Sequence, residues 1–224
     1  MLPRIQPIAP KRIHAPFDHA EFVYEIKMDG WRCLAYIENG VCRLISRKQN
    51  QFKSFSPLAA SVAKLKVQNA IIDEVVCLDK DGKSVFLDLM RRKREAAILY
   101  CFDLLVFNGE DLRALPLLER KQRLQRLIRG QAGLLYAEHV LHNGVALFQA
   151  ICDKDLEGIV AKQRLAPYAS KPQSWFKILN ANYSQKRGRK EMFDKLRQRE
   201  HVVALQPVIE PVAPVLSRHF LNQR

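Results

Sequence analysis

Apolar and polar positions alternate along this chain in short runs that predict strands, with three longer stretches of helical spacing between them. The predicted strands cover residues 22–26, 31–37, 41–47, 70–79, 98–107 and 159–161. The predicted helices begin at Ser56-Pro57, near Pro116 and at Gly144. In the first helix, Ser56 is expected as the cap and Pro57 as the first helical residue. The pattern therefore indicates a mixture of strands and helices separated by turns.

The stretch FVYEIKMDGWR, residues 22–32, combines a strand end with charged residues. The first predicted strand ends at Lys27, and Asp29-Gly30 then leads into the second strand with the spacing of a β-hairpin. A lysine at a strand end is held on a stiff element, so its amine can be aimed at a ligand. The same residues also make an ordinary hairpin turn, and the turn alone does not decide between these interpretations.

Two further predicted strands carry charged residues that are expected to be solvated, paired or bound to a ligand. Arg47 ends the third strand, where it is either a solvated residue beside a turn or a cation held for a ligand. Asp73 and Glu74 lie inside an apolar strand, and buried carboxylates are costly unless they are paired or bind something. The two acids are equally compatible with an edge strand that is protected by charge.

The most apolar strand contains Phe102, which this pattern makes either an ordinary core aromatic or a platform for a ligand. The helix that follows turns Leu117, Leu124 and Ile128 inward. Its other face is expected to be a solvated surface, with DNA contact as the lesser option. That face carries four cations, namely Arg120, Lys121, Arg123 and Arg126.

The composition of the chain indicates a polyanionic partner. With 37 Lys and Arg against 23 Asp and Glu, the 224-residue chain has a formal charge of +14. This charge suits nucleic acid, although a merely basic soluble protein has the same excess. Five cysteines without a C-x-x-C pair argue against a disulfide framework or a zinc site. No apolar run approaches the ~20 residues of a membrane span. We therefore expect a reduced, cytoplasmic protein with no membrane partner.

The pattern K-x-D-G-x-R at residues 27–32 resembles the nucleotidyl-transfer motif of ATP-dependent DNA ligases, RNA ligases and mRNA capping enzymes. The resemblance implies that Lys27 attacks the α-phosphate of ATP and becomes a covalent lysyl-AMP. Further family elements follow in the family's order, and the match extends over about residues 3–190. It is closest to the bacterial repair-type DNA ligases. It implies an α+β nucleotidyltransferase domain, with mostly antiparallel sheets enclosing the nucleotide and helices outside.

On the side of the base and sugar, the resemblance implies five contacts. Glu25 would read the base and Phe102, in the element F-D-L-L, would stack on the purine. Arg32 and Glu74 would hold the sugar, and Arg47 would contact the sugar or a DNA phosphate. The family element around Glu74 is usually written D-G-E, but here no Gly separates the two acids. This departure is expected to alter the direction of Glu74 and to weaken its contact with the sugar.

On the side of the phosphates, the element E-G-I-V-A-K implies that Glu157 binds Mg²⁺ or Mn²⁺ and that Lys162 faces the phosphates. Lys177, in Trp-Phe-Lys, matches the first lysine of the family's W-x-K-x-K element. Leu179 stands where the second cation is expected. The attacking amine must be neutral, and a free lysine is almost fully protonated at neutral pH. Cations gathered around Lys27 would disfavour its charged form and also hold the phosphates.

The resemblance also divides the chain. Residues 1–190 are expected to form the adenylation domain, and residues 191–224 a tail too short for the five-stranded OB-fold that complete ligases append. The basic run 184–190 would bind phosphates or act as a hinge. The expected partners are ATP, nicked double-stranded DNA and a protein that replaces the OB-fold, with the chain itself a monomer. The alternatives are a catalytically impaired nucleic-acid-binding remnant, or an RNA ligase or capping-type enzyme.

Overall fold

The computed structural model describes residues 2–80, 83–84, 97–169 and 171–186 of the chain. Residues Met1–Lys186 form one compact unit. The predicted boundary after residue 190, the predicted tail and the end of the basic run 184–190 lie outside the described residues. In the part that the structure describes, no helix is long and apolar enough to cross a membrane.

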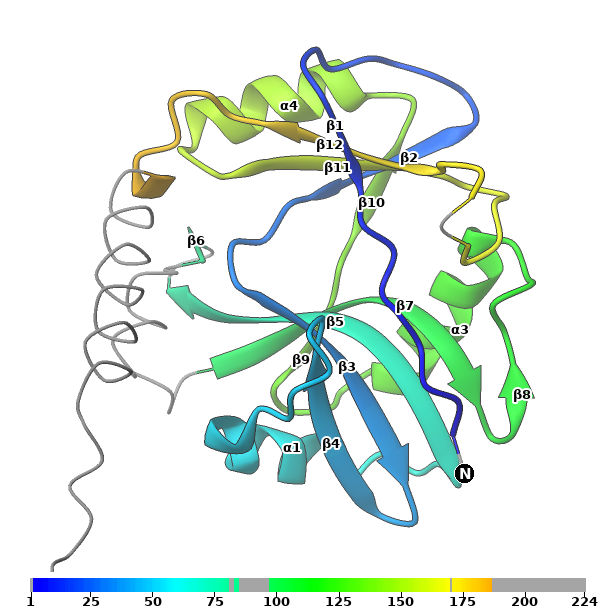
Figure 1. Ribbon diagram of the computed structural model, residues 1–224. Coiled ribbons are helices and arrows are strands. Elements are labelled where there is room, and N and C mark those ends of the chain that lie inside the picture. Colours follow the sequence, from blue (N-terminus) through cyan, green and yellow to red (C-terminus); the bar gives the residue numbers. More distant parts are fainter. Residues whose placement is uncertain (1, 81–82, 85–96, 170, 187–224) are drawn as a thin grey trace, which may run out of the picture. The chain divides into compact units, whose positions relative to one another are not determined.

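Five strands form the first sheet, in the order β1-β12-β11-β2-β10. Their bounds are β1 (Lys11–Ile13), β12 (Trp175–Leu179), β11 (Gly158–Gln163), β2 (Phe22–Ile26) and β10 (His139–Leu141). Neighbouring strands are antiparallel except β1 and β12, which run parallel. Helix α4 (Gly144–Asp153) packs on one face of this sheet (Figure 1). The apolar residues between the helix and the sheet include Tyr24, Ile159 and Ile178.

The second sheet follows the order β4-β3-β5-β7-β8, with β6 added beside β5 and β9 beside β7. Its strands are β3 (Trp31–Glu38), β4 (Val41–Ser46), β5 (Asn69–Lys80), β6 (Lys83–Ser84), β7 (Ala97–Phe107), β8 (Glu110–Asp111) and β9 (Leu134–Tyr136). The short 3-10 turn η1 (Lys53–Phe55) and the helices α1 (Ser56–Val62) and α3 (Leu117–Ile128) pack against it (Figure 1).

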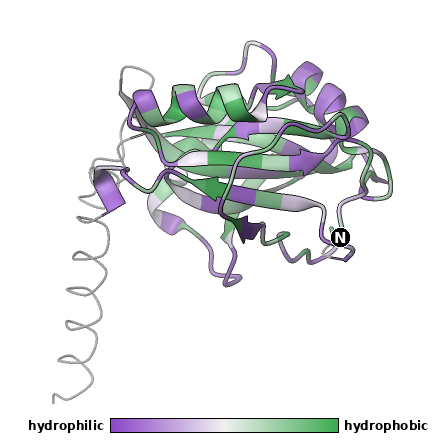
Figure 2. Cartoon of the chain, turned by 90° about the horizontal axis from the view of Figure 1, so that it is seen from above, coloured by the Kyte–Doolittle hydropathy of each residue, from purple (hydrophilic) through white to green (hydrophobic). Residues whose placement is uncertain are grey.

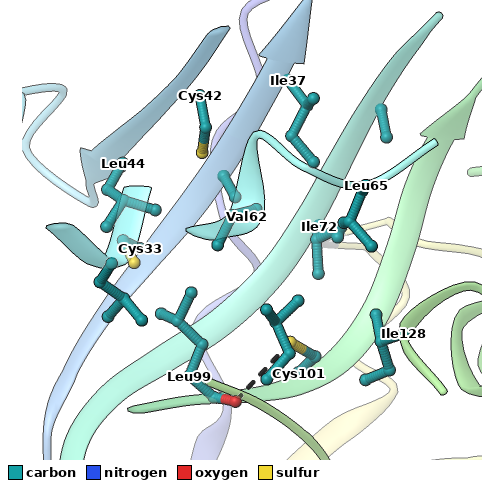
Figure 3. Close-up of a cluster of buried hydrophobic side chains, with 14 of the residues drawn as sticks. Cys33, Ile37, Cys42, Leu44, Val62, Leu65, Ile72, Leu99, Cys101 and Ile128 are labelled. Carbon is teal, nitrogen blue, oxygen red and sulfur yellow. Dashed lines mark hydrogen bonds between the residues drawn. The ribbon is translucent and has the colours of Figure 1, made fainter. Parts of the chain in front are cut away.

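Apolar side chains fill both faces of the second sheet. One cluster joins the sheet to α1 and α3 and includes Cys33, Val62, Cys101 and Ile128 (Figure 3). A second cluster lies on the opposite face and includes Phe102 from this sheet and Trp175 from the first sheet. The two sheets therefore face each other across a shared interior. Figure 2 shows hydrophobic and hydrophilic residues interspersed along the strands, as expected where the two faces of a strand have different surroundings.

The expected hairpin at Asp29-Gly30 is wrong. Strand β2 pairs with β10 and β11 in the first sheet, whereas β3 pairs with β4 and β5 in the second. The segment between β2 and β3 therefore crosses from one sheet to the other. A Cβ on Gly30 would lie 2.2 Å from the backbone oxygen of Val76. Glycine is needed here because the crossing chain passes close to β5, and a turn conformation is not the reason.

The helices begin and end close to the predicted positions, with two corrections. Phe55 occupies the cap position of α1 and makes no side-chain cap bond, so Ser56 is the first helical residue instead of the cap. On α3, Leu117, Leu124 and Ile128 are buried as predicted. Arg120 and Lys121, which were expected on the solvated face, are also fully buried.

Arg120 is buried because its charge is met by another element. Its guanidinium donates two hydrogen bonds of 2.8 Å to the carboxylate of Asp103 on β7. Both side chains are 0% exposed. Such a pair is tolerated in a core because each charge and each hydrogen-bonding group finds its partner. The pair locks α3 onto β7.

Candidate active site

Lys27 and Glu157 form the centre of the candidate site. Lys27 follows β2, and its backbone N–H donates to the carbonyl of Gly158 at 2.9 Å. Its Nζ lies 2.5 Å from Oε2 of Glu157. Gly158 permits the close packing of β11 against β12, because a Cβ there would lie 2.1 Å from the carbonyl oxygen of Ile178. The lysine predicted as nucleophile and the acid predicted as metal ligand, 130 residues apart in sequence, are therefore direct neighbours.

A cavity of about 220 Å³ opens beside this ion pair. Three tyrosines share its wall with the charged residues, and one of them, Tyr183, donates a hydrogen bond of 3.1 Å to Oδ2 of Asp29. Asp29 is only 2% exposed, so the crossing segment after Lys27 is anchored inside the protein. The polar and aromatic residues that line the cavity are Lys27, Asp29, Tyr100, Tyr136, Glu138, Glu157 and Tyr183.

Lys177 brings further positive charge to the same place. It lies on β12 opposite Val160 of β11, and Arg12 of β1 lies opposite it on the other side. Burial lowers the pKa of Lys177, and the nearby charges of Lys27, Arg47 and Arg12 lower it further, while Glu157 opposes them. Lys177 therefore lies close enough to Lys27 and to the exposed Arg47 to interact with the charge of each. Arg12 was not among the predicted site residues.

A buried group of three charges, Glu25, Lys121 and Lys162, lies next to the site. The carboxylate of Glu25 is 2.8 Å from Nζ of Lys121 and 2.6 Å from Nζ of Lys162. Nζ of Lys162 also lies 4.2 Å from the ring centres of Phe102 and Trp175, within the range of a cation–π contact. Lys162, predicted for a phosphate contact, thus touches both Glu25 and Phe102, which were predicted for the base and the purine.

The single carboxylate of Glu25 serves two ammonium groups, and the pKa values reflect this. Burial would raise the pKa of Glu25, but attraction to Lys121 and Lys162 outweighs it and lowers the pKa below its ordinary value. Burial lowers the pKa of Lys162 to about 8, and the attraction of Glu25 offsets only part of that effect. Lys162 is therefore the member of this group whose charged form is disfavoured by its surroundings.

Lys121 is the member of this group that the sequence did not reveal as a site residue. Its Nζ donates a hydrogen bond of 2.9 Å to the carbonyl of Ala137 and lies 4.5 Å from the ring centre of Tyr136. A lysine one position after Arg120 on an amphipathic helix is usually solvated. The signal in the sequence was Glu25, an acid inside the apolar strand β2, because a buried acid requires a cation from elsewhere in the fold.

Arg32 and Asp73 form a second buried pair at the same interior. The guanidinium of Arg32 donates hydrogen bonds of 2.9 and 2.6 Å to the two oxygens of Asp73. Tyr168 donates a further bond of 2.5 Å to Asp73. The Arg32 guanidinium carbon is 5.3 Å from the ring centre of Phe102. Burial would lower the pKa of Arg32, but Asp73 raises it above its ordinary value. Arg32 is thus held against the predicted purine platform.

The structure does not place Glu74 at the site, so the predicted sugar contact is wrong for this conformation. Its side chain is 0% exposed and points into the core cluster that joins the second sheet to α1 and α3. The thiols of Cys33 and Cys101 donate to it at 3.7 and 3.6 Å. Burial raises the pKa of Glu74 to about 8. Consecutive residues of a strand point to opposite faces, so without an intervening Gly it is Asp73 that faces the site.

Glu157 is the residue best suited to a divalent cation. No group of three or more His, Cys, Asp or Glu side chains that could hold a metal occurs in the described ranges. Mg²⁺ commonly binds through one or two carboxylates together with substrate phosphates and water. The Glu157 side chain is 12% exposed at the cavity wall. The donor set therefore fits a metal that arrives with a nucleotide better than one caged by the protein.

Comparisons with known proteins show that the chain is similar to DNA ligases. The chain is 34% identical over 167 residues to the multifunctional non-homologous end joining protein LigD of Pseudomonas aeruginosa, covering 70% of this chain and 20% of that protein. It is 29% identical over 190 residues to the SPbeta prophage-derived DNA ligase-like protein LigB of Bacillus subtilis, covering 81% of this chain and 69% of that protein. The chain therefore spans only a fifth of the Pseudomonas relative.

The fold has solved counterparts. A mycobacterial DNA ligase D, solved in complex with ATP and MES, superposes with a TM-score of 0.69 at 24% identity, covering 77% of this chain and 59% of that one. The model of the ATP dependent DNA ligase domain family matches residues 4–178, from before β1 to within β12. That range contains every residue of the candidate site described above, apart from Tyr183. The chain belongs to the family of the ATP dependent DNA ligase domain.

Proposed function

We propose that this domain transfers AMP from ATP to its own Lys27 and then to the 5′-phosphate of nicked double-stranded DNA for strand sealing in repair. The observation that carries the proposal is the contact between Lys27 and Glu157 at the wall of a cavity, with Lys177 close enough to Lys27 for their charges to repel each other. Family membership supports ATP as the nucleotide. The name of the Pseudomonas relative, a non-homologous end joining protein, supports the role in repair.

The first step requires the neutral amine of Lys27. Its lone pair attacks the α-phosphorus, a P–N bond forms, and the bond between the α-phosphorus and the bridging oxygen breaks. Pyrophosphate leaves with the electron pair, and the amine loses a proton. Lys177 and Arg47 hold the phosphates and offset the charge that develops on them. A divalent cation at Glu157 supplies further charge neutralisation at the phosphates when it is bound.

In the second step an oxygen of the DNA 5′-phosphate attacks the phosphorus of the lysyl-AMP. The P–N bond breaks, and Lys27 recovers its electron pair and a proton. The 3′-hydroxyl at the nick then attacks the activated 5′-phosphate and releases AMP. The excess of positive charge, +14 over the whole chain, suits the DNA backbone and makes binding sensitive to salt.

Incubation with ATP labelled at the α-phosphate and Mg²⁺ or Mn²⁺ tests the first step. We expect label on the wild-type protein, none on Lys27→Ala, and full label on the control Lys64→Ala, whose side chain is exposed outside the site. Label that persists in Lys27→Ala contradicts the proposal. Transfer of the label to a nicked duplex tests the second step.

A second candidate is a nucleic-acid-binding domain without catalysis. The inward direction of Glu74 and the apolar Leu179 favour it, because each removes a polar group that the family pattern places at the nucleotide. This candidate predicts salt-sensitive binding to DNA without any AMP transfer. Labelling that prefers GTP or RNA ends would point instead to a capping-type or RNA-ligating activity.

A further inference from the structure

The short strand β1 places a second cation beside Lys177. Strand β1 runs parallel to β12, and Arg12 is paired with Lys177 in the register of the two strands. Side chains of residues directly opposite in neighbouring strands project from the same face of the sheet. The sequence showed no function for this segment, which reads as an extended lead-in before the first predicted strand.

The face that Arg12 and Lys177 share is the one that meets the second sheet. Along β12, Phe176 and Ile178 pack into the cluster under α4, whereas Trp175 packs on the opposite face with Phe102. Lys177 therefore lies on the same face as Trp175. On β1, Ile13 packs against the cluster under α4. By alternation, Arg12 lies on the face of the candidate site, and the preceding Lys11 lies on the other.

The register also aligns Arg12 with the residue predicted to read the base. Glu25 of β2 is opposite Val160, Val160 is opposite Lys177, and Lys177 is opposite Arg12. These four residues form one row across four strands of the first sheet, with about 4.8 Å between neighbouring strands. A nucleotide whose base lies near Glu25 and whose α-phosphate lies near Lys27 would extend its outer phosphates toward Lys177 and Arg12.

The two cations of this row, Arg12 and Lys177, lie directly opposite each other, and Glu157 is the acid whose charge attracts Lys177. Like charges placed directly opposite in neighbouring strands repel each other and destabilise a sheet. Within the described part of the chain, neither Arg12 nor Lys177 forms a salt bridge, and Arg47 adds to the repulsion that Lys177 experiences. A bound anion would relieve this repulsion, so the arrangement is suited to a phosphate group.

The same row explains how the site can function with Leu179. Leu179 lies two residues beyond Lys177 on the same strand, opposite Gly158, and offers no charge where the family pattern has a second cation. Resting on the proposed transfer of AMP from ATP, we propose that Arg12 binds the β- and γ-phosphates of ATP together with Lys177 and replaces the cation absent at position 179. Its planar guanidinium can hold two phosphate oxygens at once.

Single-turnover labelling of Arg12→Ala with ATP tests this assignment, with Lys11→Ala as the matched control. Both substitutions remove one positive charge from β1, but only Arg12→Ala removes it from the face of the site. We expect Arg12→Ala to raise the ATP concentration needed for half-maximal labelling by roughly 10- to 100-fold, as for the loss of a charged hydrogen bond. Arg12→Lys is expected to need more ATP for half-maximal labelling than the wild type but less than Arg12→Ala. Lys11→Ala is expected to match the wild type within about twofold.

Two further measurements separate nucleotide phosphates from DNA phosphates. Reversal of labelling by added pyrophosphate should weaken in Arg12→Ala, whereas AMP transfer from the isolated lysyl-AMP protein to a nicked duplex should stay unchanged. A defect confined to the transfer to DNA overturns the assignment to ATP. Restoration of labelling in the double variant Arg12→Ala/Leu179→Lys supports the replacement of the missing cation.

The assignment is testable even if the wild type forms no lysyl-AMP. Calorimetric binding of ATP and of inorganic pyrophosphate should then be weaker in Arg12→Ala than in Lys11→Ala. That result would support the role of Arg12 in binding phosphates even though the proposed transfer of AMP is wrong. Equal behaviour of the two variants in both labelling and binding would overturn the role of Arg12.

Discussion

The amine of Lys27 and the carboxylate of Glu157 are 2.5 Å apart, so one acid both restrains the proposed nucleophile and lies where a metal is expected. A cation bound at Glu157 would compete with the lysine for the same oxygen atoms. Under the proposed function, binding of metal and nucleotide would then release the amine of Lys27 for reaction.

Glu157→Gln should slow the formation of lysyl-AMP by roughly 100-fold or more, a typical cost of removing one electrostatic contact to the transition state. The amide has nearly the same shape but cannot neutralise a metal. Labelling rates across a series of Mg²⁺ concentrations measure the effect, and high Mg²⁺ should restore part of the rate. If Glu157→Gln is labelled at the wild-type rate at low Mg²⁺, Glu157 does not bind the metal.

Glu25→Ala should lower the free energy of unfolding by about 3 to 5 kcal/mol, because it leaves Lys121 and Lys162 buried without a counter-charge. Glu21→Ala, an exposed acid just before β2, should change it by less than about 0.5 kcal/mol. Urea unfolding of both variants provides the measurement. Equal stability of the two variants would show that the buried charges find other partners.

Gly30→Ala should destabilise the protein more than Gly40→Ala. At Gly30 a Cβ would lie 2.2 Å from the backbone oxygen of Val76, which cannot move without shifting β5. Gly40 has a φ of +73° but open space around it, so alanine there costs about 1 kcal/mol of backbone strain. Thermal unfolding ranks the two variants. Gly30→Ala should also reduce labelling of Lys27, which lies on the same crossing segment.

Glu74 should make the protein less stable as the pH rises. Burial raises the pKa of its carboxyl from 4.5 to about 8, so the folded protein keeps a proton that the unfolded chain releases. The stabilisation is complete below about pH 4.5 and is lost as the pH rises toward 8, by on the order of a few kcal/mol. Other groups titrate in this range, so the informative quantity is the difference from Glu74→Gln.

The stability of the wild type minus that of Glu74→Gln should therefore decline between pH 5 and pH 8. Urea unfolding of both proteins at several pH values gives this difference directly. A difference that is constant over the range would mean that Glu74 is charged in the folded protein.

Local patterns were sufficient to predict six of the twelve strands and the three α-helices in the described part of the chain. The alternation around Leu44, the helical spacing from Leu117 to Ile128 and the apolar run through Phe102 all gave elements that the structure contains. The motif at residues 27–32 and the glutamate of Glu157-Gly158 marked the two residues that the fold brings into contact. These features are readable because they depend on near neighbours in sequence.

Only the tertiary structure decided which residues meet and which way they point. Strand pairing put β2 and β3 in different sheets, placed Arg12 opposite Lys177, and enclosed Lys121 with Glu25. The pleat of β5 in its sheet sent Glu74 into the core and Asp73 into the site. Sequence determines the periodicity of each strand, but its neighbour and the surroundings of each face follow from long-range packing, since contacts between distant segments carry no local signature.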